Sequence, residues 1–215
     1  MVDEKKIKET LASLRETNKK KFSQTVELIV ILKDIDIKKQ PLDFFTTLNH
    51  ERGRKMKICA LVGPELSDES KKVFDRSILQ TEFSALAGKK REIKNIASEF
   101  DFFVAQADIM ANVATVFGRI LGPKGKMPNP KAGCVVPPKT NLQPVYNRLK
   151  KTVRIQAKIS PVVQIAIGKE DQPEAEVLDN ITHVYTALIQ HLPQHINNIK
   201  GVYLKLTMSP SVKVM

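Results

Sequence analysis

Tryptophan is absent from this chain of 215 residues, cysteine occurs twice and histidine four times. Cys59 and Cys134 lie in no motif, which fits a reducing cytoplasm and leaves too few ligands for a zinc site. His191 and His195 have helical spacing, but Pro193 lies between them. No Glu follows His191, so the zinc-protease pattern fails. We therefore expect no metal and no cofactor.

Long apolar runs are also missing. No segment approaches the roughly 20 consecutive apolar residues that span a bilayer, and residues 1–8 lack the apolar core of a signal peptide. Apolar residues make up 42% of the chain and charged residues 27%, which is typical of globular proteins. The sequence predicts a globular cytoplasmic protein without a membrane partner.

Acidic residues are missing from residues 109–169, a stretch that contains eleven Lys and Arg residues. The whole chain has a formal net charge of +12, which favours a polyanionic partner, nucleic acid first. Within this stretch, residues 118–131 include three Gly and three Pro, which predicts an irregular loop. The candidates for phosphate contact in this loop are Arg119, Lys124, Lys126 and Lys131.

The same loop does not match a nucleotide-binding P-loop. That motif requires a Gly five residues before its Gly-Lys pair, and a Ser or Thr after the pair. Ile120 stands five residues before Gly125, and Met127 follows Lys126. No Gly-x-Ser-x-Gly nucleophile motif occurs either, so we assign no catalytic residue. Two rivals stay open: an α/β enzyme that clamps a phosphorylated substrate with Lys124 and Lys126, and a non-specific nucleic-acid-binding protein.

Both ends of the chain show the alternation of half-buried strands. Residues 153–159 and 162–167 are expected to pair as a hairpin across Ser160 and Pro161. Asp3 is expected to cap the first helix. The elements predicted here are helices over 2–18 and 173–192 and strands over 25–33, 153–159, 162–167 and 202–208.

The middle of the chain alternates apolar strands with helices, which implies a parallel sheet covered by helices. Residues 34–54 are polar and irregular, with a helical turn predicted over 42–45, and form a candidate crossing. The elements predicted in the middle are strands over 56–62, 77–79 and 101–106 and helices over 67–74, 81–88, 109–117 and 140–151. The sequence therefore predicts two domains: a split α+β domain, residues 1–54 and 152–215, and an inserted Rossmann-like, three-layer α/β domain, residues 55–151.

A candidate RNA-binding surface lies at the ends of the chain. Phe22 follows three lysines and precedes a strand, so it is either a core residue or a platform for RNA bases and sugars. Lys21 is placed to contact phosphate, and Thr25 and Glu27 offer hydrogen-bonding groups. An acceptor such as Glu27 distinguishes RNA from DNA through the 2′-hydroxyl. Residues 207–211 are either a plain chain end or an edge that fits an RNA minor groove.

Residues 118–133, Gly-Arg-Ile-Leu-Gly-Pro-Lys-Gly-Lys-Met-Pro-Asn-Pro-Lys-Ala-Gly, resemble the signature of the family of the first protein of the large ribosomal subunit. That family forms the mobile lateral stalk beside the tRNA exit site. Three further segments agree in order and spacing: residues 21–27, residues 163–169 with the helix at 179–181, and residues 207–214. The resemblance covers essentially the whole chain, and its short basic form is closer to archaeal than to bacterial members.

The resemblance implies a non-enzymatic RNA-binding protein of two domains, monomeric when free and located on the cytoplasmic ribosome. The terminal domain would bind a three-way-junction region of the large-subunit rRNA, and the inserted domain would contact the deacylated tRNA that leaves the exit site. Family members in bacteria and archaea also repress translation of their own mRNA. The implied rRNA contacts are Lys21, Phe22, Thr25, Glu27, Thr207, Met208 and Ser209, with Lys158 and Lys169 as further candidates.

Two positions depart from the family pattern. Ser209 stands where the family usually has Gly, and Leu206 stands where it often has Thr. Gly permits a positive φ and a close approach of the backbone, which Ser permits less freely. We expect Ser209 and Leu206 to alter individual contacts with the RNA rather than to abolish RNA binding.

Overall fold

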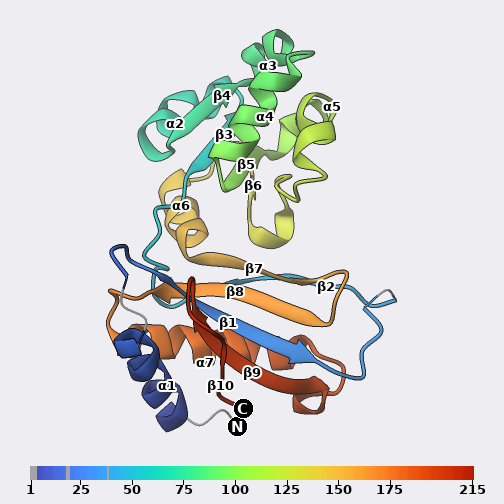
Figure 1. Ribbon diagram of the computed structural model, residues 1–215. Helices are drawn as coiled ribbons and strands as arrows, with labels where there is room; N and C mark the ends of the chain where they lie inside the picture. Colours follow the sequence, from blue (N-terminus) through green and yellow to red (C-terminus); the bar gives the residue numbers. More distant parts are fainter. Residues whose placement is uncertain (1–3, 18–19, 38) are drawn as a thin grey trace. The chain divides into compact units, whose positions relative to one another are not determined.

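The computed structural model describes residues 4–17, 20–37 and 39–215, and the chain divides into two compact units (Figure 1). Unit 1 combines residues 1–54 with residues 151–215, and unit 2 consists of residues 55–150. Lys151 falls in unit 1, one residue from the predicted boundary. The predicted fold class is confirmed, because the chain contains both antiparallel and parallel sheets packed with helices.

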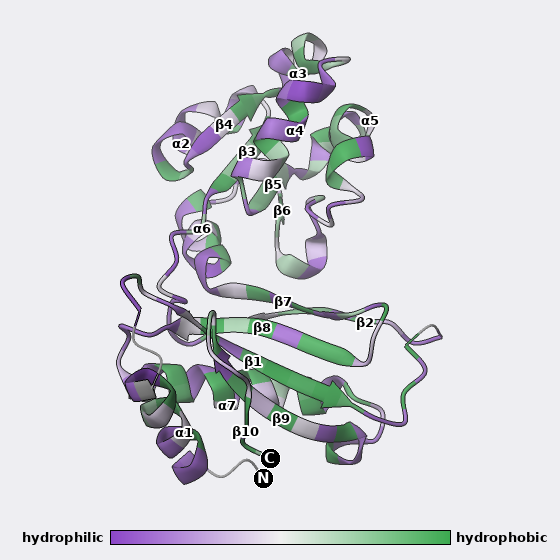
Figure 2. Cartoon of the chain, viewed as in Figure 1, coloured by the Kyte–Doolittle hydropathy of each residue, from purple (hydrophilic) through white to green (hydrophobic). Residues whose placement is uncertain are grey.

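Unit 1 is built on a four-stranded antiparallel sheet in the order β10-β9-β1-β8. Residues of β1 are buried at every second position, so one face of the strand packs against the core and the other is open. Figure 2 shows that β1 is largely apolar along its length. The strands are β1 (Thr25–Leu32), β8 (Val162–Lys169), β9 (Ile199–Leu206) and β10 (Val212–Lys213).

The covered face of this sheet packs against two helices, α1 (Glu4–Thr17) and α7 (Glu174–His191). Ile7, Leu11 and Leu14 of α1 form the predicted apolar stripe and are buried in the same core as β1. The expected cap, Asp3, lies outside the described residues. A short 3-10 helix, η4 (His195–Asn198), precedes β9. Among the described residues, α1 and α7 pack on one face of the sheet, and side chains of β1 and β9 occupy the open face.

Two local predictions in unit 1 are wrong. The expected helical turn at 42–45 is a strand, β2 (Leu42–Thr47), which pairs antiparallel with β7 (Thr152–Ala157). Its aromatic and threonine residues suit a strand once a partner is available. The expected hairpin of β7 with β8 does not form, because β8 pairs with β1. Pro161 has no amide hydrogen to donate, and its carbonyl accepts from the Leu32 amide at 2.7 Å, which joins this turn to β1.

Unit 2 is built on a parallel sheet, as predicted, and its strands lie in the order β4-β3-β5-β6. Helices α3, α4 and α5 share a core with Cys59, Leu61 and Phe103 on one face of this sheet. The remaining residues of β3 are buried as well, so both faces are covered. On the other side, α6 is held to α2 by the Leu142 amide, which donates to Glu69 at 2.8 Å.

The strands of unit 2 are β3 (Ile58–Val62), β4 (Arg76–Leu79), β5 (Phe102–Gln106) and β6 (Val135–Val136). Its α-helices are α2 (Ser67–Val73), α3 (Gln80–Leu86), α4 (Lys90–Glu99), α5 (Met110–Leu121) and α6 (Leu142–Lys151), whose last residue belongs to unit 1. Three 3-10 turns complete it: η1 (Pro64–Leu66), η2 (Ala107–Ile109) and η3 (Pro130–Ala132). Among the described residues, no helix is both long enough and apolar enough to cross a bilayer.

The predicted loop at 118–131 begins later than expected. Helix α5 continues through Gly118 and Arg119 to Leu121. A Gly inside a helix costs roughly 1 kcal/mol relative to Ala. Burial of Leu121, together with the packing of Ile120 on the same core, offsets that cost. The loop therefore starts at Gly122, and Arg119 projects from a helix.

Candidate nucleic-acid interface

Two exposed apolar side chains stand at one end of the sheet in unit 1. Phe22 is 53% exposed and Met208 is 64% exposed, so the alternative of a core Phe22 is wrong. Phe22 precedes β1, and Met208 lies in the turn that follows β9. We call this region the β1–β9 corner and define it as Lys21, Phe22, Gln24, Thr25, Glu27, Lys205, Thr207 and Met208.

Hydrogen bonds join the two segments of the corner. The Thr25 amide donates to Thr207 Oγ1 at 3.0 Å, and the Met208 amide donates to Gln24 Oε1 at 3.1 Å. The Gln24 side chain is fully buried, and its Nε2 donates to Glu170 Oε2 at 3.3 Å. The Glu170 amide in turn donates to the Gln24 carbonyl at 2.9 Å. The backbones that carry Phe22 and Met208 are therefore held in fixed register before any partner binds.

Ser209 closes the turn beyond Met208 and does not project from the corner. Its side chain is buried, and its hydroxyl accepts from the Leu206 amide at 2.7 Å. The hydroxyl hydrogen can be donated to the carbonyl of Leu206 at 3.3 Å or of Pro210 at 3.0 Å. Outside glycine, only Asp34 and His195 have positive φ among the described residues. The backbone at Ser209 thus makes no demand for glycine, and its hydroxyl stabilises the turn instead.

The corner also includes a pair of opposite charges on the open face of the sheet. Glu27 lies across from Lys205 in the β1–β9 ladder, with Lys205 Nζ 4.0 Å from Glu27 Oε2. Lys169 lies across from Thr25 in the β1–β8 ladder, at the same end of the sheet. Its side chain is half-buried, and its amide donates to Gln172 Oε1 at 2.8 Å. The corner therefore combines cations, a carboxylate and hydroxyls around two apolar side chains.

Lys158 lies at the opposite end of the same sheet. It belongs to the turn that leads into β8, whose residue Val162 pairs with Ile31 near the end of β1. Lys158 Nζ is 3.7 Å from Asp43 Oδ2. Asp43 also accepts two hydrogen bonds from Arg154, at 2.7 and 2.6 Å, which hold the pKa of its carboxyl below the ordinary value. The structure does not bring Lys158 together with the corner.

Two of the four candidate cations of unit 2 are bonded within that unit. Lys126 Nζ donates to the carbonyls of Ala97 at 3.0 Å and Phe100 at 2.6 Å, at the C-terminal end of α4. A cation there satisfies free carbonyls and complements the helix dipole. Lys124 Nζ donates to Ser98 Oγ at 2.7 Å. Arg119 and Lys131 have exposed side chains.

The two cysteine thiols are poorly suited to act as nucleophiles or metal ligands. Burial raises the pKa of the Cys59 thiol to about 12 and that of Cys134 to about 11. Neither is therefore a thiolate at neutral pH, which is the form that acts as nucleophile or metal ligand. Within the described part of the chain, no group of three or more His, Cys, Asp or Glu side chains is placed to hold a metal ion.

Sequence reasoning missed three residues that build or support the corner, and two of them had no local signal. Gln24 is important because it accepts from the Met208 amide, a contact that joins residues 184 positions apart. Glu170 supports Gln24 from another strand end. Lys205 could have been found, because the alternation predicted for 202–208 places it on the same face as Thr207.

Together, these features define a basic protein of mixed α/β class that presents an ordered contact surface and lacks a thiolate nucleophile. The model of the Ribosomal protein L1p/L10e family matches residues 14–210. The chain is 40% identical to the large ribosomal subunit protein uL1 of Nanoarchaeum equitans over 205 residues, covering 94% of this chain and 95% of that protein.

Two further relatives bear the same name. The protein of Thermococcus kodakarensis is 40% identical over 211 residues, covering 97% of this chain and 94% of the relative. The protein of Methanocaldococcus jannaschii is 35% identical over 216 residues, covering 99% and 96%. The chain therefore belongs to the ribosomal protein L1 family, which confirms the resemblance drawn from residues 118–133 and its archaeal character. The family is one of ribosomal proteins rather than of enzymes.

Proposed function

We propose that this chain is a structural protein of the large ribosomal subunit that binds large-subunit rRNA through the β1–β9 corner. One observation carries the proposal: Phe22 and Met208 are exposed on two segments that hydrogen bonds lock together. Two exposed apolar side chains on joined segments form a surface that a partner can cover, and RNA offers base and sugar faces for it. Family membership makes rRNA the expected partner.

Each group of the corner has a chemical role in this proposal. Phe22 packs on a base or a sugar, and Met208 contacts the shallow minor groove. Lys21 and Lys205 contact phosphates, which position the RNA without reading its sequence. Glu27 and Thr207 accept or donate hydrogen bonds to 2′-hydroxyls. Lys169 is a further phosphate contact at the same end, and Ser209 acts by holding the turn.

The test is rRNA affinity across a salt series, with a transcript of the stalk junction and an unrelated hairpin as competitor. Met208→Asp places a carboxylate in the interface, and we expect roughly tenfold or greater loss of affinity for the junction. Ile159→Asp is the matched control. It introduces the same charge at a side chain that is 97% exposed, beside Lys158 at the other end of the sheet.

Three outcomes are informative. Loss with Met208→Asp but little change with Ile159→Asp supports the corner as the binding surface. Equal losses would mean that charge alone matters and would contradict the proposed site. Binding without preference for the junction, and falling steeply with salt, would indicate a non-specific nucleic-acid-binding protein.

We further propose the finer roles that the family resemblance implies. The chain would form the mobile lateral stalk of the cytoplasmic ribosome, where unit 2 would contact deacylated tRNA at the exit site through Arg119, Lys124 and Lys131. The same corner would bind its own mRNA and repress translation. If so, the mRNA leader and the rRNA junction compete for one site, and Met208→Asp weakens both. If the mRNA leader and the rRNA junction bound without competing, the proposed repression through the corner would be wrong.

A further inference from the structure

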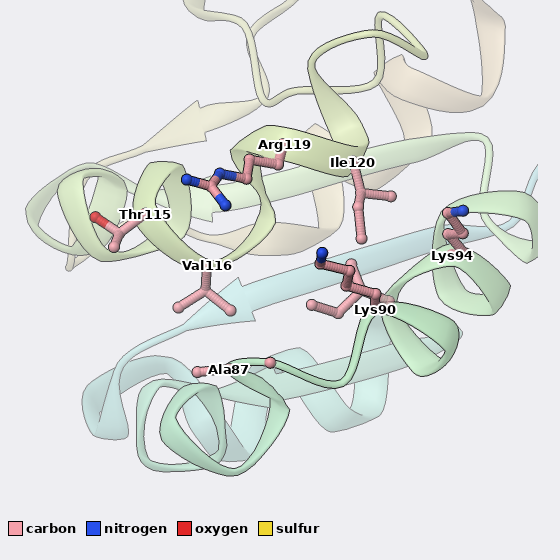
Figure 3. A pocket seen from close by; sticks show the side chains of 9 residues that line it. Ala87, Lys90, Lys94, Thr115, Val116, Arg119 and Ile120 are labelled. Carbon is pink, nitrogen blue, oxygen red and sulfur yellow. The ribbon is translucent and has the colours of Figure 1, made fainter.

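A groove opens on the surface of unit 2 between helices α4 and α5. It has a volume of about 470 Å³, within the range of ligand-binding pockets. Ile93, Val116 and Ile120 supply its apolar lining, and Ala87 and Gly88 from the α3–α4 turn close one end. Figure 3 shows Val116 and Ile120 pointing from α5 toward the space beside Lys90 and Ala87.

Cations stand on both sides of this groove. Lys90 and Lys94 come from α4, and Arg119 comes from α5. All three side chains are exposed, and none of them forms a salt bridge with any described residue. No acidic residue lines the groove. Three unpaired positive charges around an aliphatic floor fit a ligand that is both anionic and aliphatic.

The lining argues against a nucleotide base as the occupant. No aromatic side chain lines the groove, so there is no platform on which a base could stack. The one hydroxyl in the lining, that of Thr115, already donates to the Ala111 carbonyl at 3.0 Å. A base would therefore find no aromatic stacking surface, and the only free side-chain donors of the lining are the three cations, which bind carboxylate as readily as a base edge. The aliphatic floor favours apolar side chains over a base.

We infer that the α4–α5 groove binds an acidic segment of a partner protein that inserts aliphatic side chains between the two helices. Leucine, isoleucine or valine side chains of the partner pack on Val116, Ile120 and Ile93. Its carboxylates pair with Lys90 and Lys94 on one side and with Arg119 on the other. A groove between two helices that receives an amphipathic helix is a recurring mode of peptide recognition. This site is separate from the rRNA surface of unit 1, and it shares Arg119 with the tRNA contact proposed above for unit 2.

The probe is a peptide of about 14 residues, long enough to form a helix, with Leu at i, i+3, i+4 and i+7 and Glu on the flanking positions. A scrambled peptide of the same composition and a single-stranded RNA oligonucleotide serve as comparisons. Methyl NMR spectra of the full chain report the binding site. We expect saturable shifts of the Ile93, Val116 and Ile120 methyls with the amphipathic peptide, and smaller shifts with the scrambled one.

A matched pair of variants separates groove contact from general charge. Val116→Glu puts a carboxylate on the groove floor, and we expect roughly tenfold weaker peptide binding. Ala114→Glu adds the same charge to an exposed position of the same helix outside the groove lining, and it should bind nearly as well as the wild type. Val116 packs on the core, so Lys94→Glu, at an exposed residue, gives a second test that does not disturb folding.

Several results would overturn the inference. One is a pair of equal losses for Val116→Glu and Ala114→Glu, which would indicate unspecific attraction of the peptide to a basic surface. Another is a shift of the same methyls by the RNA oligonucleotide with no effect of the peptide, which would make the groove a nucleic-acid site. The absence of methyl shifts with both probes would show that the groove is not a docking site for either.

Discussion

The two sheets of this protein differ in how many of their faces are covered. In unit 1, β1 alternates between buried and half-exposed residues, so one face is open. In unit 2, every residue of β3 is buried, because helices cover both faces of a parallel sheet. The difference determines where each unit can meet a partner. Unit 1 can offer the ordered surface of a sheet, whereas unit 2 can offer only helices, turns and loops.

The two units also differ in what their charges do. Unit 2 contains the basic loop, yet Lys126 and Lys124 are bonded to α4, and Arg148 donates to the Gly133 carbonyl at 3.2 Å. The corner of unit 1 has fewer cations but exposes Phe22 and Met208. Phosphate contacts are shared by all RNA, while apolar and 2′-hydroxyl contacts depend on shape. A count of charges therefore points to unit 2, which has the stronger positive electrostatic field. It does not find the corner of unit 1, which offers the more specific contacts to RNA.

The largest expected effect is a loss of stability when a substitution opens a cavity in the core of unit 2. Phe117 is fully buried and meets the Phe83 ring edge-on, with centroids 5.3 Å apart. Phe117→Ala should destabilise unit 2 by about 3–5 kcal/mol while leaving rRNA affinity unchanged, because the corner belongs to unit 1. Hydrogen exchange of the two units, measured beside rRNA binding, checks this. Leu28→Ala in unit 1 should show the reverse pattern. Equal loosening of both units by either variant would mean that they unfold as one.

The next effect concerns the loop lysine that faces inward. Lys126→Met removes a charged donor from the carbonyls of Ala97 and Phe100, and we expect a loss of about 1.5–3 kcal/mol in the unfolding free energy of unit 2. Lys131→Met, at an exposed position of the same loop, should cost less than about 0.5 kcal/mol. Urea unfolding midpoints measure both. If the two variants had the same stability and Lys126→Met weakened tRNA binding more, Lys126 would be a contact residue after all.

The sequence predicts the elements whose pattern is periodic along the chain. The alternation of residues 25–33 locates β1, and the helical stripe from Val177 to Leu188 locates α7, because local periodicity reflects burial on one side. The strand at 42–47 is missed because only its partner β7, more than 100 residues later, makes it a strand. The last turn of α5 is missed because Gly118 is interpreted as the end of the helix. Only the burial of Leu121 shows that the helix continues.

The candidate site shows the same limit. Residue types indicate that Lys21, Phe22 and Met208 suit RNA, but only the structure places Phe22 outside the core. Sequence reasoning also treats Lys126 as free, because nothing local reveals that its ammonium group reaches the end of α4. Contacts between distant segments, such as Gln24 with Met208, depend on strand order. They become visible only when β1 and β9 are known to be neighbours.

A smaller effect is expected from the buried amide beneath the corner. Gln24→Leu leaves the Met208 amide without its acceptor and loosens the segment that carries Met208. We expect rRNA affinity to fall by about threefold to tenfold, with faster hydrogen exchange at the Met208 amide. Gln156→Leu changes an exposed residue of β7 in the same unit and serves as control. Unchanged affinity in Gln24→Leu would mean that the rRNA itself orders the corner.

The smallest effect depends on pH and lies in the two-stranded sheet of β2 and β7 in unit 1. The Arg154 guanidinium lowers the pKa of Asp43 below the value of about 3.9 for an unfolded Asp. A lowered native pKa stabilises the fold above the unfolded pKa, and this stability is lost as pH falls through the native pKa. The stability difference between wild type and Asp43→Asn should therefore be constant near neutral pH and shrink below about pH 4. Urea unfolding over a pH series measures this, with Asp36→Asn, which removes an exposed pair with Lys39, as control. A difference that persisted undiminished at the lowest pH would show that Asp43 acts through packing and neutral hydrogen bonds, and not through its charge.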